Sequence, residues 1–119
     1  MKTAKRKIGD LGEERACRIL TEKGYKIIDR NFSCKIGELD IVAVKDGTIS
    51  FIEVKSRNTT DFGLPCQAVN LHKQRNIKCT AEYYMKVNKW CFGLQPRFDI
   101  FELLNLESGV YYRFLTNAF

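Results

Sequence analysis

Residues 37–57 read GELDIVAVKDGTISFIEVKSR, and this stretch decides the fold. The Asp-Gly dipeptide at 46–47 separates two runs of alternating, β-branched residues. That pattern predicts a β-hairpin, because both central residues of a tight hairpin turn must tolerate positive φ. Counting outward from the turn brings Asp40 opposite Glu53. The hairpin therefore predicts two carboxylates that face each other across neighbouring strands.

The predicted acids share their face of the hairpin with apolar residues. Successive side chains of a strand point to opposite faces, so the pairs on each face can be assigned from the turn. One face pairs Val44 with Ile49, Val42 with Phe51, Asp40 with Glu53 and Glu38 with Lys55, and the other pairs Ala43 with Ser50, Ile41 with Ile52 and Leu39 with Val54. Both faces are largely apolar and are predicted to be buried.

The facing carboxylates need a positive partner, because opposed like charges are destabilising and a buried carboxylate without a counter-charge is costly. Oxygen ligands at this spacing suit Mg²⁺ or Mn²⁺, so Asp40 and Glu53 are the predicted metal ligands. Lys55 can then contact an attacking water or a developing negative charge. The alternative is a half-exposed sheet on which Lys55 neutralises Glu38 and Glu53. The interleaved Val, Phe and Ile favour the buried site.

The composition indicates one soluble domain over residues 1–119. No apolar run approaches the roughly 18 residues of a membrane span, and MKTAKRK leads into acidic residues, so we expect a cytoplasmic protein without a membrane partner. Five dispersed cysteines form no C-x-x-C pair and are expected to be reduced. No zinc site is predicted, because a single histidine, His72, and dispersed cysteines form no recognisable ligand set, and His72 is expected on a helix surface.

The net charge of +6 favours a polyanionic partner. If acidic side chains gather at a metal site, the remaining surface is more basic than the total suggests. The residues available for phosphates are Lys5, Arg6, Lys7, Lys35, Arg57, Lys73, Arg75 and Lys78. The run from Lys5 to Lys7 is either a solvated tail or a DNA-binding arm.

A first helix is predicted from Ile8 to Lys23, with Gly24 just past its end. Glu13 lies at helical spacing from Ala16 and Leu20, so its carboxylate shares the apolar, core-facing side of this helix. Such a carboxylate needs a partner. It either caps a backbone group or pairs with a lysine, or it reaches the edge of the acid pair.

The remaining elements follow from periodicity and turn residues. Strands are predicted at Tyr25–Phe32, Glu38–Val44, Thr48–Lys55, Arg97–Leu104 and Val110–Leu115, a loop at Asn58–Pro65 and a second helix at Gln67–Val87. Lys73 falls on the inward side of that helix. It either lays its methylenes on the core or contacts a phosphate at the rim of the site.

The order of a helix with Glu13, a strand with Asp40, a strand with Glu53-Val54-Lys55 and a second helix resembles the PD-(D/E)XK nuclease superfamily. The segments GEERACRIL, GY, RNF, GELDIVA, FIEVKSR, FGLPCQAV, HKQR and RFDIFEL resemble successive blocks of the YraN-like family of small bacterial proteins. That family is regarded as a predicted endonuclease, similar to archaeal Holliday junction resolvases. The resemblance implies a restriction-endonuclease-like α/β fold, with a central mixed sheet and a β-hairpin core flanked by helices.

The resemblance also implies a site and an activity. The catalytic set would be Glu13, Asp40, Glu53 and Lys55, in an Mg²⁺- or Mn²⁺-dependent endonuclease that hydrolyses DNA, with Arg57, Lys73 and Arg75 binding the nucleic acid. Kinship with resolvases implies branched DNA as the substrate and a homodimer. Two alternatives stay open: a non-catalytic nucleic-acid-binding module of the same fold, and a structural or assembly factor whose charges satisfy one another.

Overall fold

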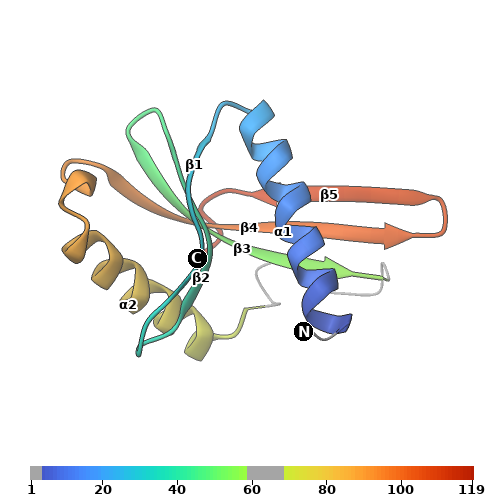
Figure 1. Cartoon of the computed structure of the whole chain (residues 1–119), viewed down its shortest axis with the longest axis horizontal. Coiled ribbons are helices and arrows are strands. Elements are labelled where there is room, and N and C mark those ends of the chain that lie inside the picture. Colours follow the sequence, from blue (N-terminus) through green and yellow to red (C-terminus); the bar gives the residue numbers. More distant parts are fainter. Residues whose placement is uncertain (1–3, 59–68) are drawn as a thin grey trace.

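A computed structural model describes residues 4–58 and 69–119 of the chain, with side chains described from residue 11 onward. Two α-helices and a five-stranded mixed sheet make up this part of an α/β protein (Figure 1). The helices are α1 (Ala4–Glu22) and α2 (Leu71–Val87), the strands are β1 (Lys26–Ser33), β2 (Glu38–Lys45), β3 (Thr48–Arg57), β4 (Gln95–Leu106) and β5 (Gly109–Leu115), and a short 3₁₀ helix, η2 (Lys89–Cys91), follows α2. All the predicted elements that fall on described residues are present.

The sheet follows chain order, β1-β2-β3-β4-β5. Strands β3 and β4 are parallel and are joined by the crossover that contains α2, whereas the other neighbours are antiparallel. In the β2–β3 hairpin, Val44 pairs with Ile49, as predicted. The turn residues Asp46 (φ 50°) and Gly47 (φ 78°) both adopt the left-handed conformation that the Asp-Gly dipeptide permits.

The two helices cover opposite faces of the sheet (Figure 1). Apolar stripes on both helices account for this, because each helix buries one side against strands that are hydrophobic on both faces. The α2-side core contains Val42, Ile49, Phe51, Ile77, Ala81, Tyr84 and Ile100, and the α1-side core contains Ala16, Leu20, Tyr25, Ile41, Ala43, Ile52, Phe101 and Leu103. The predicted assignment of the two hairpin faces is therefore correct near the turn.

The assignment fails farther from the turn, at Leu39. This residue packs in the α2-side core, whereas Val54 packs against the α1-side core, so the prediction that they share a face is wrong. The β2–β3 ladder runs from the turn to the pair Ile41 and Ile52. On the other side of β2, Leu39 pairs with Phe32 of β1, and Asn31, the residue before Phe32, has a positive φ of 54°.

Helix α2 begins later than predicted. Asn70 has an extended conformation (φ −70°, ψ 168°), and its side chain accepts a hydrogen bond from the backbone N–H of Lys73, so the helix starts at Leu71. Residues 67 and 68, and most of the predicted loop at 58–65, lie outside the described residues. The cap fixes the first turn of α2 and hence the direction of its side chains.

Gly37 sets the distance between the β1–β2 connection and α2. A Cβ atom at this position would lie 2.9 Å from the Thr80 Oγ1 atom, closer than real Cβ contacts. Thr80 in turn donates a hydrogen bond of 2.7 Å to the backbone carbonyl of Asn76. The missing side chain therefore lets the start of β2 lie directly against the N-terminal half of α2.

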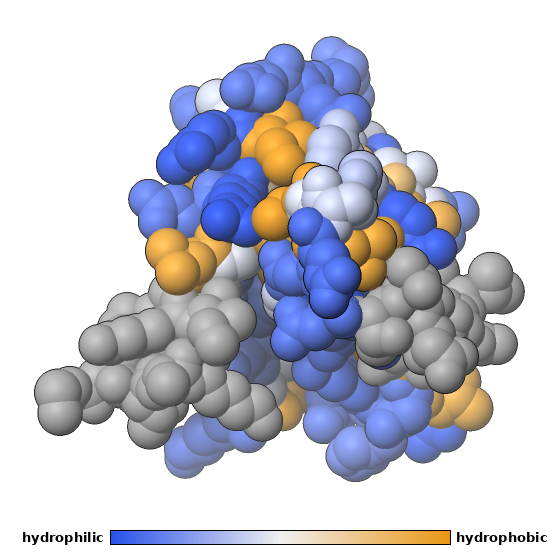
Figure 2. Space-filling view, turned by 90° about the vertical axis from the view of Figure 1, so that its right-hand side faces the viewer, coloured by the Kyte–Doolittle hydropathy of each residue, from blue (hydrophilic) through white to orange (hydrophobic). Residues whose placement is uncertain are grey.

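The right-hand end of the molecule in Figure 1 faces the viewer in Figure 2. Apart from the residues drawn in grey, most of the surface in this view is hydrophilic, with smaller hydrophobic groups between the hydrophilic side chains. Within residues 4–58 and 69–119, no helix is long and apolar enough to cross a membrane. Cys17, Cys34, Cys79 and Cys91 are free thiols, whereas Cys66 falls outside the described residues.

Candidate active site

Asp40 and Glu53 lie where the β2–β3 ladder ends. The Asp40 Oδ2 atom accepts a hydrogen bond of 2.9 Å from the backbone N–H of Val54. The Glu53 carboxylate accepts one from the backbone N–H of Asp40. Each acid thus takes a backbone donor from the opposite strand, beyond the last ladder pair. This exchange holds the two carboxylates beside each other, as the hairpin register predicted.

Burial makes this acid pair electrostatically costly. The side chain of Glu53 is only 4% exposed. Burial, followed by the neighbouring charge of Asp40, raises the Glu53 pKa to about 7. Burial also raises the Asp40 pKa, and the hydrogen bond from Val54 opposes that rise. Near neutral pH Glu53 therefore exchanges its proton, and a cation at the site would favour the ionised pair.

Two lysines provide the positive charge beside the acids. The Lys73 Nζ atom, from the first turn of α2, lies 3.7 Å from the Glu53 Oε1 atom. Lys55 contacts Lys73, and its pKa is lowered by burial and then by that second ammonium group. Burial also disfavours the charge on Lys73. A side-chain hydrogen bond with Lys55 and the negative charges of Glu53 and Asp40 outweigh that effect, so the pKa of Lys73 is raised. Lys73 thus turns its ammonium group toward the acids.

A cavity of about 410 Å³ opens beside the acid pair. It lies between the start of β2 and the first two turns of α2, and it is lined by Gly37, Glu38, Asp40, Glu53, Asn70, His72, Lys73, Asn76 and Ile77. His72 is exposed, as predicted, and its Nε2 atom lies 3.4 Å from the Asn76 Nδ2 atom. The periodicity of α2 placed neither residue at the site, because the cavity depends on how α2 docks on the sheet.

Glu13 occupies a different environment. It is buried on α1, and its Oε2 atom lies 3.8 Å from the Nη2 atom of Arg30 on β1. The cavity lining does not include it. The partner of Glu13 is thus an arginine, where the sequence left a lysine, a backbone cap and the edge of the acid pair as alternatives, and the catalytic role of Glu13 stays a prediction.

Two other predicted phosphate-binding residues, Arg57 and Arg75, do not line the cavity. Arg75 is exposed on α2 and does not line the cavity. Arg57 lies at the end of β3, with its Nε atom 3.8 Å from the Oε2 atom of Glu102. The side chains of Lys5, Arg6 and Lys7 fall outside the described part of the chain. The structure thus brings together Asp40, Glu53, Lys55 and Lys73 as one cluster.

The acid pair fits a divalent cation of the magnesium type. Among the described residues, no group of three or more histidine, cysteine or acidic side chains is arranged to hold a metal by itself. Mg²⁺ does not need such a group, since it commonly binds through one or two carboxylates and keeps water for its other positions. A buried and a half-buried carboxylate that repel each other at the wall of the cavity match that requirement.

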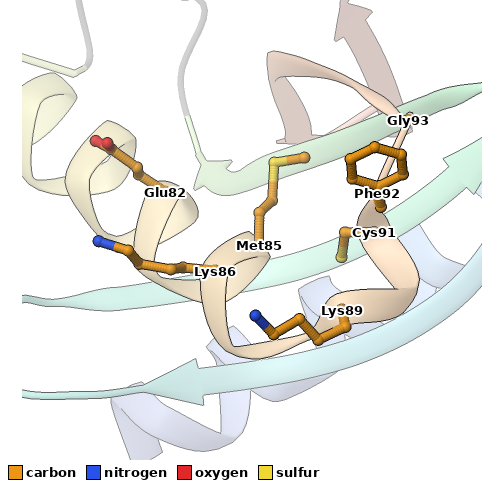
Figure 3. Close-up of a pocket in the computed structure, with 7 residues that line it drawn as sticks. All are labelled: Glu82, Met85, Lys86, Lys89, Cys91, Phe92 and Gly93. Carbon is orange, nitrogen blue, oxygen red and sulfur yellow. The ribbon is translucent and has the colours of Figure 1, made fainter.

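A larger cavity, of about 480 Å³, lies at the opposite end of α2 (Figure 3). It is lined by Glu82, Met85, Lys86, Lys89, Cys91, Phe92 and Gly93. Glu82 is the single acid of this lining, and the ring of Phe92 is 97% exposed. This cavity therefore lacks the pair of acids that lines the smaller one.

Residues 12–103 match the model of the Uncharacterised protein family UPF0102. The chain belongs to the UPF0102 family. A UPF0102 protein of Caldanaerobacter subterraneus subsp. tengcongensis is 45% identical over 108 residues, which cover 90% of this chain and 88% of the relative. One of Caldicellulosiruptor saccharolyticus is 43% identical over 107 residues, covering 89% and 90%. One of Clostridium perfringens is 42% identical, covering 100% and 98%. The UPF0102 match spans the whole cavity lining.

Proposed function

We propose that this protein is a metal-dependent endonuclease of the restriction-endonuclease-like fold, which hydrolyses phosphodiester bonds in DNA. The observation that carries the proposal is the acid pair. Glu53 is buried and Asp40 is half-buried beside it at the end of a hairpin ladder, and each is held by a backbone N–H of the other strand. Lys55 lies beside them. Buried like charges are retained where a cation or a reaction requires them.

Asp40 and Glu53 would hold Mg²⁺ or Mn²⁺. When bound, the cation supplies charge neutralisation at the phosphate and lowers the pKa of a water molecule that can attack it. The cavity beside the acids provides room for that water and for a phosphate group. Because both carboxylates have raised pKa values, metal binding would release protons and strengthen as pH rises.

The two lysines have distinct roles in this proposal. Lys55 donates a hydrogen bond to the phosphate oxygens as negative charge develops on them. Lys73, 3.7 Å from Glu53, favours the ionised form of that carboxylate and so opposes the rise of its pKa. Arg57 and Arg75 bind phosphates of the DNA backbone, with little dependence on base sequence. The resemblance to resolvases extends the proposal to branched DNA and to a homodimer that cuts two strands.

The proposal is tested by combining calorimetry with DNA cleavage. Mg²⁺ and Mn²⁺ are titrated into the wild type, the D40N/E53Q variant and an E82Q control, which neutralises an exposed acid on the same helix as Lys73. Cleavage is measured on linear duplex, single-stranded and four-way-junction DNA. We expect wild type and E82Q to bind metal and cut, and D40N/E53Q to do neither. If the wild type neither binds metal nor cuts any of these substrates, the proposal is wrong.

The two rival functions are separated by DNA binding without metal. A non-catalytic nucleic-acid-binding module would bind DNA with an affinity that falls as salt rises, because phosphate contacts release counterions. A structural or assembly factor would show no binding even at low salt. Binding without cleavage would therefore favour the first rival, and the absence of both would favour the second.

A further inference from the structure

We propose that Arg57 and Arg113, organised by the buried carboxylate of Glu102, form a binding site for a nucleic-acid phosphate beside the acid pair. The inference rests on the proposed function in one respect, namely that the substrate is a nucleic acid. It adds Arg113 and Glu102, which the sequence did not single out, and it gives Arg57 a defined partner. We call these three side chains the arginine site.

The arginine site is built around one fully buried acid. Glu102 on β4 is 0% exposed. The Arg113 Nη2 atom lies 2.7 Å from its Oε1 atom, and the Arg57 Nε atom lies 3.8 Å from its Oε2 atom. The arginines approach from the two strands that flank β4, one for each carboxylate oxygen. Such a pairing fixes where both guanidinium groups lie.

The register of the sheet places the arginine site next to the proposed catalytic cluster. Lys55 pairs with Glu102 across β3 and β4, and Glu102 pairs with Arg113 across β4 and β5. These three residues form one row across the sheet. Ile100, two residues before Glu102, packs in the α2-side core, so the row lies on that same face.

Arg57 extends this row along the strand. It is two residues beyond Lys55, a separation of about 6.6 Å along a strand. Lys55 and Arg57 point to the same face, as alternate residues of a strand do. If one phosphate of a nucleic-acid strand lies at the acid pair, a neighbouring phosphate of the same strand would therefore lie at the arginine site.

The exposure of the two arginines favours a ligand over a purely structural role. The side chains of Arg57 and Arg113 are 30% and 40% exposed, so both reach the solvent from a buried anchor. A guanidinium group carries five N–H donors in a planar fork that matches phosphate geometry.

The test measures DNA binding in EDTA, where no cleavage occurs. A labelled DNA duplex is titrated with the wild type, R57Q, R113Q, R113K and the matched control R18Q, which removes an exposed arginine on α1. Anisotropy is recorded over a series of salt concentrations, and thermal unfolding confirms that each variant is folded. Cleavage in Mg²⁺ is measured in parallel on the same DNA.

We expect R113Q and R57Q each to weaken binding by about tenfold at low salt and to reduce the salt slope by about one. R113K should retain the salt slope but bind several-fold more weakly, because lysine keeps the charge and loses the fork. R18Q should bind as the wild type does. If R113Q unfolds, R113K and R57Q still decide the question.

The inference and the proposed function can fail separately. If the wild type cuts DNA, yet R57Q, R113Q and R113K bind it like R18Q, the arginine site is wrong and the nuclease stands. If R57Q and R113Q weaken binding as expected while the wild type never cuts, the arginine site stands and the nuclease is wrong. A wild type that does not bind DNA in EDTA overturns the arginine site.

Discussion

Glu53 is a single residue whose position in the candidate site lowers the stability of the fold. Its carboxylate is buried beside Asp40, within the hydrophobic environment of the sheet, and Lys73 compensates for only part of that burial. A surface acid would have no such raised pKa. The raised pKa, which reflects the energetic cost of burying this charge, distinguishes Glu53 from the exposed acids of the chain.

Substitution of Glu53 by glutamine should change how stability depends on pH. The Glu53 pKa is raised from 4.5 to about 7, so the protonated folded state is favoured below 4.5 and that advantage disappears as pH rises through about 7. The wild type should therefore lose on the order of 3 kcal/mol relative to E53Q across this range. Glutamine retains an acceptor for the Asp40 N–H.

The measurement is urea denaturation of both proteins at about pH 5 and about pH 8, chosen to lie on the two sides of the titration. The difference between wild type and E53Q isolates the contribution of residue 53 from the other titrating groups. A difference that stays constant with pH would show that the Glu53 pKa is not raised in the folded protein. E82Q serves as the exposed control.

Among the secondary-structure elements, helix α2 positions one wall of the cavity. Its first two turns contribute His72, Lys73, Asn76 and Ile77 to the lining. Two local features hold those turns in place: the cap at Asn70 and the close approach of the β1–β2 connection. Changes at either feature should therefore affect the site through the helix, without touching the acids.

Removal of the cap by N70A should destabilise the protein by about 1 kcal/mol, because the backbone N–H of Lys73 loses its acceptor. N70S should retain most of the stability, since serine also caps helices well. Thermal unfolding compares the three proteins. Equal stability of N70A and N70S would mean that the side chain at position 70 does not contribute to the cap.

A methyl group at position 37 should force the start of β2 away from α2. G37A would place its Cβ atom 2.9 Å from the Thr80 Oγ1 atom, and overpacking of this kind costs about 1–3 kcal/mol. The T80A substitution removes that oxygen, so the double variant should be more stable than the two single effects predict. Additive losses in a double-mutant cycle of unfolding free energies would contradict this contact.

Across the whole molecule, clusters of buried polar side chains join segments that are far apart in the sequence, and one such cluster lies on each side of the sheet. On the α1 side, Arg97 contacts both carboxylate oxygens of Asp99 and also donates to the Tyr25 hydroxyl, at 2.6 Å, and to Ser50. Asp99 accepts a further hydrogen bond from the backbone N–H of Asn117. This cluster joins four segments and lies away from the proposed site.

The D99N substitution should destabilise the fold by about 3 kcal/mol, because it leaves Arg97 without its buried counter-charge. Chemical denaturation measures the loss, and D46N, in the exposed hairpin turn, is the control and should stay within about 0.5 kcal/mol of wild type. Below its melting temperature, D99N should bind metal as the wild type does. Weaker metal binding by a folded D99N would show that the two clusters are coupled.

The sequence by itself determined the hairpin, its register and the pair of acids. Asp46 and Gly47 specify a turn that few other residues allow, and a strand repeats every two residues, so one turn fixes the faces of both strands. Helical spacing likewise placed Glu13 on a buried side of α1. These are local rules, and they failed at Leu39, which lies beyond the last pair of the β2–β3 ladder.

Only the tertiary structure decided which distant residues meet at the site. The parallel pairing of β3 with β4 aligns Lys55 with Glu102, and the docking of α2 places Lys73 on Glu53. Neither contact can be read from a periodic pattern of the sequence, because each joins segments that the crossover between β3 and β4 separates in the chain. The buried charges are positioned by packing, and packing is a property of the assembled fold.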